Sequence, residues 1–365
     1  MVRYGVVGDV HNHPERLIFA LNRLRDEYGV DVLVGNGDLC EAQGDPTDCY
    51  NNGAITWTSF LQTGLESYLI PGNHDNYFSF AQLNDRFALN HPNRSKVKAF
   101  THDFHKIRKG NHNIIFIPGS DFFVPNGFVI GEEHESGKYI RQDDQLKPFQ
   151  DGDLEWITGQ TGQMPEIIHY TNLNEFKYMI GDSELNIVFC HIPRRFEFGG
   201  NSVDSGHFID VYRVNTNGNP DLLDTGQEDH VLSKVGFHLF DENTMRRFGF
   251  TGTLVMPHGV GNFSNRNVFE FAKAHSDGIV DVAVEKKGGN GNVKLGNLFD
   301  ELGINIAVNG HFHKFIAHNS DGNSVFPNTP VDDLYVNHGS FDNGDAIILD
   351  VNEDGKVSYE RPKIF

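Results

Sequence analysis

The sequence predicts an α/β fold, in which a largely parallel sheet is covered by helices on both faces. Two observations predict this class. Short runs of apolar and β-branched residues recur along the 365 residues, and helix-forming segments separate them. Several of these runs end directly in a cluster of Gly, Asp, Asn and His. At roughly 150 residues per domain, the length indicates about two domains, or one domain with a large insertion.

The first forty residues predict a βαβ unit. The run 4–7 reads as a buried strand, and the run 32–34 reads as the next one. Between them, residues 14–28 predict a helix, with Pro14 in the first turn and Gly29 as the stop. Its apolar residues recur at helical spacing: Leu17, Ile18, Leu21 and Leu24.

Five apolar runs lead into clusters of polar residues. The runs are 4–7, 32–34, 68–70, 187–189 and 304–308. The clusters that follow them are 8–11, 35–38, 71–75, 190–191 and 309–313. Open α/β sheets bind ligands at the carboxyl ends of their strands. We therefore expect the five clusters to converge at one edge of the fold.

The carboxyl end of the chain predicts a β-hairpin. The segment 350–355 imitates the start of an EF-hand calcium loop, but Arg361 stands where that loop needs Glu. Flanking runs at 347–349 and 356–359 have the pattern of strands, and an Asp-Gly pair lies between them. A hairpin with an Asp-Gly turn is the better interpretation.

The spacing of the clusters predicts an insertion. Long stretches separate Asn73 from His191 and His191 from His311, and the second stretch is rich in Gly, Asn and Asp, which is typical of loops. We expect a catalytic domain made of 1–195 and 298–365, interrupted by a cap or subdomain at 196–297. Because both ends of this insertion adjoin predicted clusters, we expect it to narrow access to the site.

The clusters contain a set of metal-binding side chains. They supply Asp9, His11, Asp38, Asn73, His74, His191, His311 and His313. Apart from His74, this mixture of carboxylates, one amide and imidazoles suits Mn, Fe or Zn better than the all-oxygen cages of Ca²⁺ or Mg²⁺. Asp38 could bridge two ions, since a carboxylate has two oxygens. Two ions about 3.5–4 Å apart can activate a water and clamp a phosphoryl group.

At this point the sequence resembles the calcineurin-like metallophosphoesterases. Their pattern is D-x-H, G-D-x-x-[DE], G-N-H-[DE], a lone His and G-H-x-H. The matching blocks here are 9–11, 37–41, 72–75, His191 and 310–313. A further segment, 336–340, resembles the N-P-G-S turn of many phosphodiesterase-like members, with His338 in place of Pro.

The resemblance implies a four-layer α/β/β/α sandwich, here with a large inserted cap. By carry-over, one metal ion would be held by Asp9, His11, Asp38 and His313, and the other by Asp38, Asn73, His191 and His311. His74 resembles the residue that stabilises the transition state or protonates the leaving oxygen, and Asp75 could orient it. The nucleophile would be a metal-bound hydroxide that attacks in line, without a covalent enzyme intermediate.

The implied function is hydrolysis of a phosphomonoester or phosphodiester with two divalent or trivalent ions, manganese first and iron or zinc as alternatives. The protein phosphatases of this superfamily carry Arg after the second block and before G-N-H, where this chain has Ala42 and Pro71. A DNA or RNA nuclease is the alternative within the fold. A non-catalytic scaffold is a third reading, which the retention of every expected ligand disfavours.

Charge narrows the choice of substrate. The formal net charge of −20 repels nucleic acid and anionic membranes unless a local cation overrides it. We therefore expect a small or single-stranded phosphate ester rather than duplex nucleic acid or a membrane surface. With neither a signal-like start nor an apolar run of about 18 residues, a cytoplasmic protein is expected. Arg194 and Arg195 could clamp a substrate phosphate, or they could pair with acidic neighbours.

Overall fold

A computed structural model describes most of the chain, which divides into two units. Unit 1 comprises Met1–Asp204 and Gly291–Phe365, and unit 2 comprises Ser205–Asn290. The residues left undescribed are 12, 41–45, 88–90, 102, 122–125, 143–144, 150–165, 182–183, 199–201, 225–230, 240–253 and 257–263. The sequence also suggests a loop at 258–261 and, by the family resemblance, a helix at 153–157, but both segments lie outside the described residues.

One six-stranded sheet of unit 1 contains the predicted βαβ unit. Its strands are β1 (Val2–Val7), β2 (Val32–Asn36), β3 (Glu66–Ile70), β4 (Val97–Ala99), β19 (Ile347–Val351) and β20 (Val357–Glu360). Their order is β20-β19-β1-β2-β3-β4, with β1 to β4 parallel. Strands β19 and β20 form the predicted antiparallel hairpin, and Gly355 in its turn has φ of +86°. Glycine adopts this left-handed conformation without a steric cost.

The second six-stranded sheet carries the remaining predicted strands. Its members are β5 (His105–Lys109), β6 (His112–Ile117), β11 (Leu185–Cys190), β16 (Ile306–Asn309), β17 (Phe315–His318) and β18 (Leu334–His338). Their order is β17-β18-β16-β11-β6-β5. Strands β6, β11, β16 and β18 run parallel, so their carboxyl ends lie at one edge.

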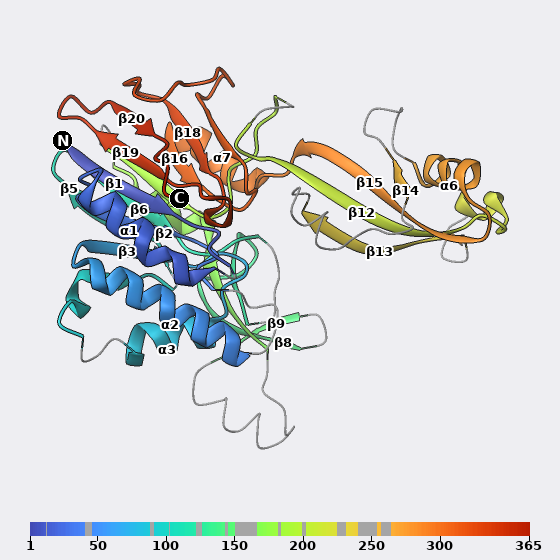
Figure 1. Ribbon diagram of the computed structural model, residues 1–365, viewed down its shortest axis with the longest axis horizontal. Coiled ribbons are helices and arrows are strands. Elements are labelled where there is room, and N and C mark those ends of the chain that lie inside the picture. The colour runs from blue at the N-terminus through green and yellow to red at the C-terminus, as the bar shows by residue number, and fades with distance from the viewer. Residues whose placement is uncertain are drawn as a thin grey trace. The chain divides into compact units, whose positions relative to one another are not determined.

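Helices cover the two outer faces (Figure 1). They are α1 (Leu17–Asp26), α2 (Pro46–Thr63) and α3 (Tyr77–Gln82) on one side and α7 (Val293–Leu302) on the other. Short helical turns complete unit 1: η1 (Pro14–Arg16), η2 (Leu83–Phe87), η3 (Arg94–Lys96), η4 (Leu173–Met179) and η7 (Phe341–Asn343).

Three apolar cores hold these layers together. Alternate residues of a strand face opposite sides of its sheet, so Val6 packs between the two sheets while Val7 packs under α1 and α2. In the same way Ile114 joins the core between the sheets and Ile115 joins the core beneath α7. The expected four-layer α/β/β/α arrangement is therefore confirmed.

A small third sheet was not foreseen from the sequence. Strands β7 (Phe128–Gly131), β8 (Gly137–Gln142), β9 (Gln145–Pro148) and β10 (Ile167–Asn172) pair in the order β7-β10-β8-β9. The sheet lies in the chain between β6 and β11, and its Phe128 packs against Phe80 of α3. These four strands account for part of the long stretch of sequence between Asn73 and His191.

Unit 2 has a core of its own. It contains β12 (Ser205–Asn215), β13 (Leu232–Leu239), β14 (Leu254–Met256), β15 (Ile279–Gly289), the turn η5 (Pro220–Asp224) and the helix α6 (Asn265–His275). Valines of β12 and β15 pack with Phe269 of α6. The segment expected as an insertion, 196–297, contains this unit.

Among the described residues, no helix is both long and apolar enough to cross a bilayer.

Candidate metal centre

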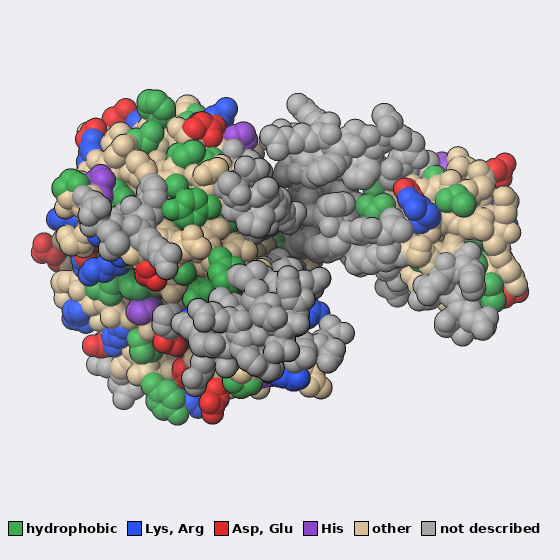
Figure 2. All heavy atoms as spheres, turned by 90° about the horizontal axis from the view of Figure 1, so that it is seen from below, with side chains coloured by type: hydrophobic (Ala, Val, Ile, Leu, Met, Phe, Trp, Pro, Cys, Tyr) green, Lys and Arg blue, Asp and Glu red, His purple; other side chains and the backbone are tan. Residues whose placement is uncertain are grey.

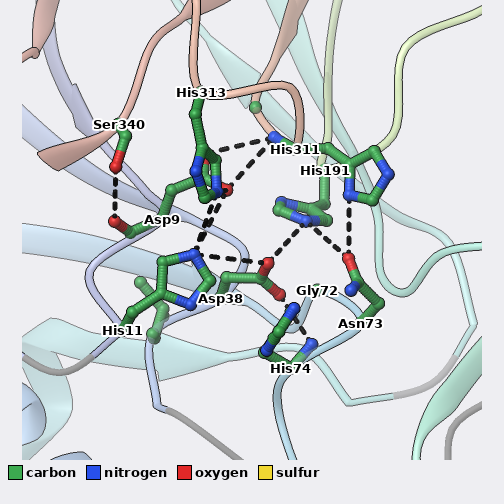
Figure 3. A network of polar contacts seen from close by, with 12 residues as sticks. Asp9, His11, Asp38, Gly72, Asn73, His74, His191, His311, His313 and Ser340 are labelled. Atoms are coloured by element: carbon green, nitrogen blue, oxygen red, sulfur yellow. Dashed lines mark hydrogen bonds and ion pairs between the residues drawn. The ribbon is translucent and has the colours of Figure 1, made fainter. Parts of the chain in front are cut away.

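The carboxyl ends of five strands bring the predicted donor residues together (Figure 3). Asp9 and His11 follow β1, Asp38 follows β2, and Asn73 follows β3. From the second sheet, His191 follows β11, and a single loop after β16 carries the last two donors, His311 and His313. All of these residues are buried except His313, which is partly buried.

The backbone of this edge is unusual. Eight described residues other than glycine have positive φ. Five of them are Asp9, His11, Asp38, His311 and His313, with φ between 46° and 73°. Such values are uncommon outside glycine and are often found where function requires a particular side-chain direction. Here they turn the side chains away from the strands and towards one another.

Asp9, His11 and His313 form a first group of donors. One ligand atom from each lies within 4.8 Å of the others. His313 Nε2 is 3.2 Å from Asp9 Oδ1, and His11 Nε2 is 3.0 Å from His313 Nε2. Donor atoms on one ion lie roughly 3 Å apart when each bond is about 2.1 Å long. The spacing of this group is thus compatible with a shared ion.

Asp38, His191 and His311 form a second group under the same criterion. His191 Nε2 lies 3.1 Å from Asp38 Oδ2 and 3.1 Å from Asn73 Oδ1. The same Asn73 oxygen lies 2.9 Å from His311 Nδ1. The amide of Asn73 therefore adds a fourth potential ligand to this group.

Asp38 stands between the two groups. Its Oδ2 is 3.9 Å from His11 Nε2 as well as 3.1 Å from His191 Nε2. Its Oδ1 accepts the backbone N–H of His74 at 2.8 Å. A third donor group joins His11, Asp38 and His74, so the His74 side chain reaches the centre from the β3 loop.

The chain also matches a family. The model of the calcineurin-like phosphoesterases covers residues 2–233, which include the first four motif blocks. The chain belongs to the calcineurin-like phosphoesterase family.

Other comparisons add distant likenesses only. No curated protein matches the chain. Among solved structures, TT1561 of Thermus thermophilus is 9% identical, with 100% of both chains covered and a TM-score of 0.44. A dimetal phosphatase from Danio rerio is 11% identical over 100% of this chain and 96% of its own, with a TM-score of 0.41. GAP50, the anchor in the inner membrane complex of Plasmodium, is 9% identical over 100% and 84%, with a TM-score of 0.41. The assignment rests on the family model.

The electrostatics of this phosphoesterase centre favour anionic carboxylates. Burial would raise the pKa of Asp9, but the imidazole of His313 holds it below its ordinary value. The pKa of Asp38 is lowered against the same burial, mainly by His191. Burial favours neutral His191, yet Asp38 and Asp9 outweigh it and raise the pKa of His191 to about 9. Both carboxylates are thus kept in the charged form that attracts cations.

Further hydrogen bonds hold the potential metal-binding residues in position. His191 Nδ1 donates to the backbone oxygen of Asn36 at 3.2 Å, which orients the ring so that Nε2 faces Asp38. The hydroxyl of Ser340, from the segment that resembles the N-P-G-S turn, donates to the backbone oxygen of Asp9 at 3.2 Å. The imidazole of His338 lies 3.9 Å from the Asp9 carboxylate and donates to Gly339 O.

Asp75 joins two of the metal-bearing loops through hydrogen bonds to their backbones. Its carboxylate accepts backbone N–H groups from Gly72 at 2.7 Å, Cys40 at 2.8 Å and Leu39 at 3.3 Å. Both of its oxygens are used in this way, so Asp75 joins the loops that carry Asp38 and Asn73. These bonds order the two loops, and the role of Asp75 in orienting His74 stays a prediction.

Arg194 does not face the centre as a free phosphate clamp. Its guanidinium is buried and binds both carboxylate oxygens of Asp300 on α7, at 2.6 and 2.9 Å. It also stacks on the ring of Phe196, 4.6 Å from the centroid. Of the two readings of the arginine pair, pairing with an acidic neighbour is therefore the one observed for Arg194. The side chain of Arg195 is exposed.

Three supporting asparagines at strand ends were not predicted from the sequence. Asn36 donates to Cys190 O and Val308 O, which ties the two sheets together behind the metal ligands. Asn309 donates to Cys190 O at 3.3 Å, and Asn337 donates to Gly310 O at 2.6 Å. Each is the last or next-to-last residue of its strand, which is the signal that could have identified them.

Proposed function

We propose that the chain is a phosphoric ester hydrolase that works with two metal ions at this centre. The observation that carries the proposal is the pair of donor groups, Asp9–His11–His313 and Asp38–His191–His311, with Asp38 also within reach of His11. A carboxylate in that place could hold both ions, since its Oδ2 lies near a histidine of each group. Phosphomonoesters and phosphodiesters are both candidate substrates.

The donor set fits first-row transition metals. Imidazoles supply nitrogen, and Asp9, Asp38 and Asn73 supply oxygen, which suits Mn, Fe or Zn. We propose manganese first, with Asp9, His11, Asp38 and His313 holding one ion and Asp38, Asn73, His191 and His311 the other. When bound, such ions polarise the phosphoryl oxygens and lower the pKa of a water.

The protein's own contribution would be positioning and proton transfer. His74 lies in a donor group with Asp38 and His11, and its backbone N–H is fixed by Asp38. An imidazole held at this edge can donate a proton to a leaving oxygen. Asp75 and Asn36 keep the loops in place, so the donors need little rearrangement when substrate binds.

Charge supports a small or single-stranded ester. On the face in Figure 2, Lys and Arg side chains are interspersed with Asp and Glu over the described part of unit 1, and its described residues form no continuous basic patch there. Together with the net charge of −20, this disfavours duplex nucleic acid. A nuclease for single strands remains the second candidate, and a non-catalytic scaffold the third.

A substrate panel tests the proposal. Protein stripped of metal and resupplied with Mn²⁺ should hydrolyse p-nitrophenyl phosphate, bis(p-nitrophenyl) phosphate or a cyclic nucleotide faster than single-stranded DNA. Hydrolysis should disappear without the metal. Mn²⁺-loaded protein that hydrolyses none of these esters would contradict the proposal, and preferential cleavage of DNA would favour the nuclease.

We further propose that unit 2 restricts which esters reach the centre. The first and last strands of the unit pair at their base, Ser205 with Gly289, so a short Gly/Ser linker can replace 205–290 without stretching unit 1. The shortened protein should keep its metals and accept a wider range of esters. If it binds metals but treats every ester as the parent does, unit 2 has another role.

A further inference from the structure

His338 is the last residue of β18, and its side chain is buried beside the metal centre. It stands where the turn of the resembling phosphodiesterases has Pro. Its Nδ1 lies 3.9 Å from Asp9 Oδ2, yet His338 belongs to none of the donor groups found among the described residues. The ring is therefore close to the centre without being one of its expected ligands.

The segment that contains His338 is bonded to two metal-bearing loops. Asn337 donates its side-chain N–H to Gly310 O at 2.6 Å, and the hydroxyl of Ser340 donates to Asp9 O at 3.2 Å. Asp9 follows β1 of one six-stranded sheet, and Gly310 follows β16 of the other. Residues 337–340 thus connect the loop after β1 with the loop after β16.

The imidazole of His338 lies against the main chain of both loops. A Cβ atom added to Gly8 would lie 2.6 Å from the ring atoms Cε1 and Nε2, and one added to Gly310 would lie 2.7 Å from Nε2. Ordinary contacts between carbon atoms are about 3.5–4.0 Å long, so only glycine fits against the ring at both positions. Gly8 precedes Asp9, and Gly310 precedes His311. The ring is therefore a spacer that sets the distance between the two loops.

The ring also limits where the Asp9 carboxylate can lie. Its Nδ1 donates to Gly339 O at 2.7 Å, which fixes the orientation of the ring. Asp9 Oδ2 lies beside this ring and accepts the N–H of His311 at 3.1 Å. The other oxygen, Oδ1, lies 3.2 Å from His313 Nε2. One oxygen of Asp9 is thus held by the protein, and the other faces the first group of donors.

We propose that His338 is a positioning residue for one of the two metal ions, the ion assigned to Asp9, His11, Asp38 and His313. It acts through Asp9, whose loop it holds at the distance from His313 that a shared ion requires. The inference rests on the proposed function, because it presumes two ions at the centre. Replacing a residue that orients a metal ligand typically costs about 10–100-fold in metal affinity.

The second ion should depend less on His338. Asp9 is not among the expected ligands of that ion. The loop after β16 also has an anchor on that side, since the N–H of Gly310 donates to His191 O at 2.9 Å. Loss of the imidazole should therefore weaken the binding of one ion selectively.

His318 is a matched control within the same sheet. It is the last residue of β17, is as buried as His338, and its Nδ1 likewise donates to the backbone oxygen of the next residue at 2.7 Å. Its Nε2 accepts the N–H of Val203 at 2.9 Å. Strands β17 and β18 are antiparallel, so their carboxyl ends lie at opposite edges of the sheet. His318→Ala should lower the stability of the protein and leave both metal affinities unchanged.

Calorimetric titration of the metal-free full chain with Mn²⁺ measures both ions in the absence of substrate. Wild-type protein and His318→Ala should bind two Mn²⁺ per chain with the same pair of affinities. His338→Ala should bind one of the two ions about 10–100-fold more weakly. His313→Ala and Asn73→Ala each remove an expected ligand of a single ion, and so identify the affinity that belongs to it. His338→Ala should weaken the same ion as His313→Ala.

Three results of this titration would overturn the proposal. His338→Ala could bind both ions as tightly as the wild type, lose affinity equally for both, or weaken only the ion that Asn73→Ala affects. Equal losses are what a general loosening of the fold produces, and urea titration of each variant measures that loosening independently.

Two further variants separate the spacer from the hydrogen bond, and they carry the test if His338→Ala does not fold. His338→Asn keeps an N–H near Gly339 O but is too short to reach Gly8 and Gly310. His338→Gln is longer and can occupy the space beside the two glycines. We expect His338→Gln to restore most of the lost affinity, and His338→Asn to bind as weakly as His338→Ala. A His338→Asn variant that binds both ions as the wild type does would show that the ring is not a spacer.

Hydrolysis assays on the same proteins keep this inference apart from the proposed function. If the wild type binds two ions and His338→Ala loses affinity for one, but no ester is hydrolysed, the positioning role stands and the proposed function fails. If esters are hydrolysed and His338→Ala binds both ions as tightly as the wild type, the positioning role is wrong and the function stands.

Discussion

The two ends of the sheet sandwich treat polar residues in opposite ways. At the carboxyl ends of the strands, Asp9, Asp38 and His191 are buried and face one another across short distances. At the amino ends, Tyr4 and His112 are equally buried but form a single bond of 2.6 Å between Tyr4 Oη and His112 Nε2. The carboxyl ends bring several potential metal ligands together, whereas at the amino ends two buried polar groups hydrogen-bond to each other.

Backbone conformation follows the same division. Tyr4 and His112 lie within β1 and β6, whereas Asp9, His11 and Asp38 leave their strands with positive φ. Conformations of that kind cost stability and persist where the surrounding structure enforces them. The comparison indicates that the carboxyl end is arranged for binding and chemistry, and the amino end for holding the sheets together.

The largest effect should come from Asp38, which lies between the two donor groups. Asp38→Ala should lower kcat/KM by about 10³-fold or more, because one metal ion supplies several kcal/mol of charge stabilisation. It should also remove at least one metal equivalent by elemental analysis. Asp350→Asn, beside Arg3 at the other end, should keep full metal content. Two metals per chain in Asp38→Ala would show that the assignment of ligands is wrong.

His74 separates chemistry from metal binding at the same end. His74→Ala should retain both metals and lower kcat by about 10²–10⁴-fold, the usual cost of losing a positioned acid. The loss should be smaller for p-nitrophenyl esters, whose leaving group needs little protonation. His275→Ala, an exposed histidine on α6, is the control. Equal losses for good and poor leaving groups would favour electrostatic stabilisation over proton donation.

A substitution in the Tyr4–His112 pair should change the stability of the protein and leave its activity unchanged. Tyr4→Phe removes the hydroxyl that His112 binds and should lower the free energy of unfolding by about 1–3 kcal/mol, the cost of an unsatisfied buried group. Urea titration measures the change, and metal content should stay the same. Tyr178→Phe, at a side chain 80% exposed, should have no effect. A loss of metal in Tyr4→Phe would contradict the claim that only the carboxyl ends of the strands serve metal binding.

A smaller effect should appear in the pH dependence of stability. Burial, helped by Arg108, lowers the pKa of His112 from 6.5 to about 4. Between these values the unfolded chain binds a proton that the folded chain does not, so the free energy of unfolding should fall as pH drops from about 6.5 to about 4. His112→Gln should have a shallower dependence over that interval. Identical slopes would contradict a neutral buried His112.

The potential metal ligands at the carboxyl ends could be predicted, because each motif indicates both where a strand ends and which ligand type follows it. In 309–313, for example, an apolar strand is followed by Gly and by two histidines, which gives both the position and the ligand type. Parallel pairing then brings such strand ends together without further information. The convergence of Asp9, Asp38 and His191 followed from that rule.

Pairing between distant segments could not be predicted in the same way. Arg194 binds Asp300, and Tyr4 binds His112, only because of how helices and sheets pack in three dimensions. The sequence shows Arg194 next to His191 and thereby suggests a role at the site. The small sheet around Tyr170 was missed because its short strands lack a motif that marks their ends.

The central claim is that Asp38 belongs to two ions at once, and electron paramagnetic resonance of the Mn²⁺-loaded protein tests it most directly. Two Mn²⁺ ions per chain joined by one carboxylate should give the broad spectrum of a spin-coupled pair. In Asp38→Asn that spectrum should change to the six-line signal of isolated ions. A wild-type protein that shows only isolated Mn²⁺ at two equivalents per chain would contradict the account.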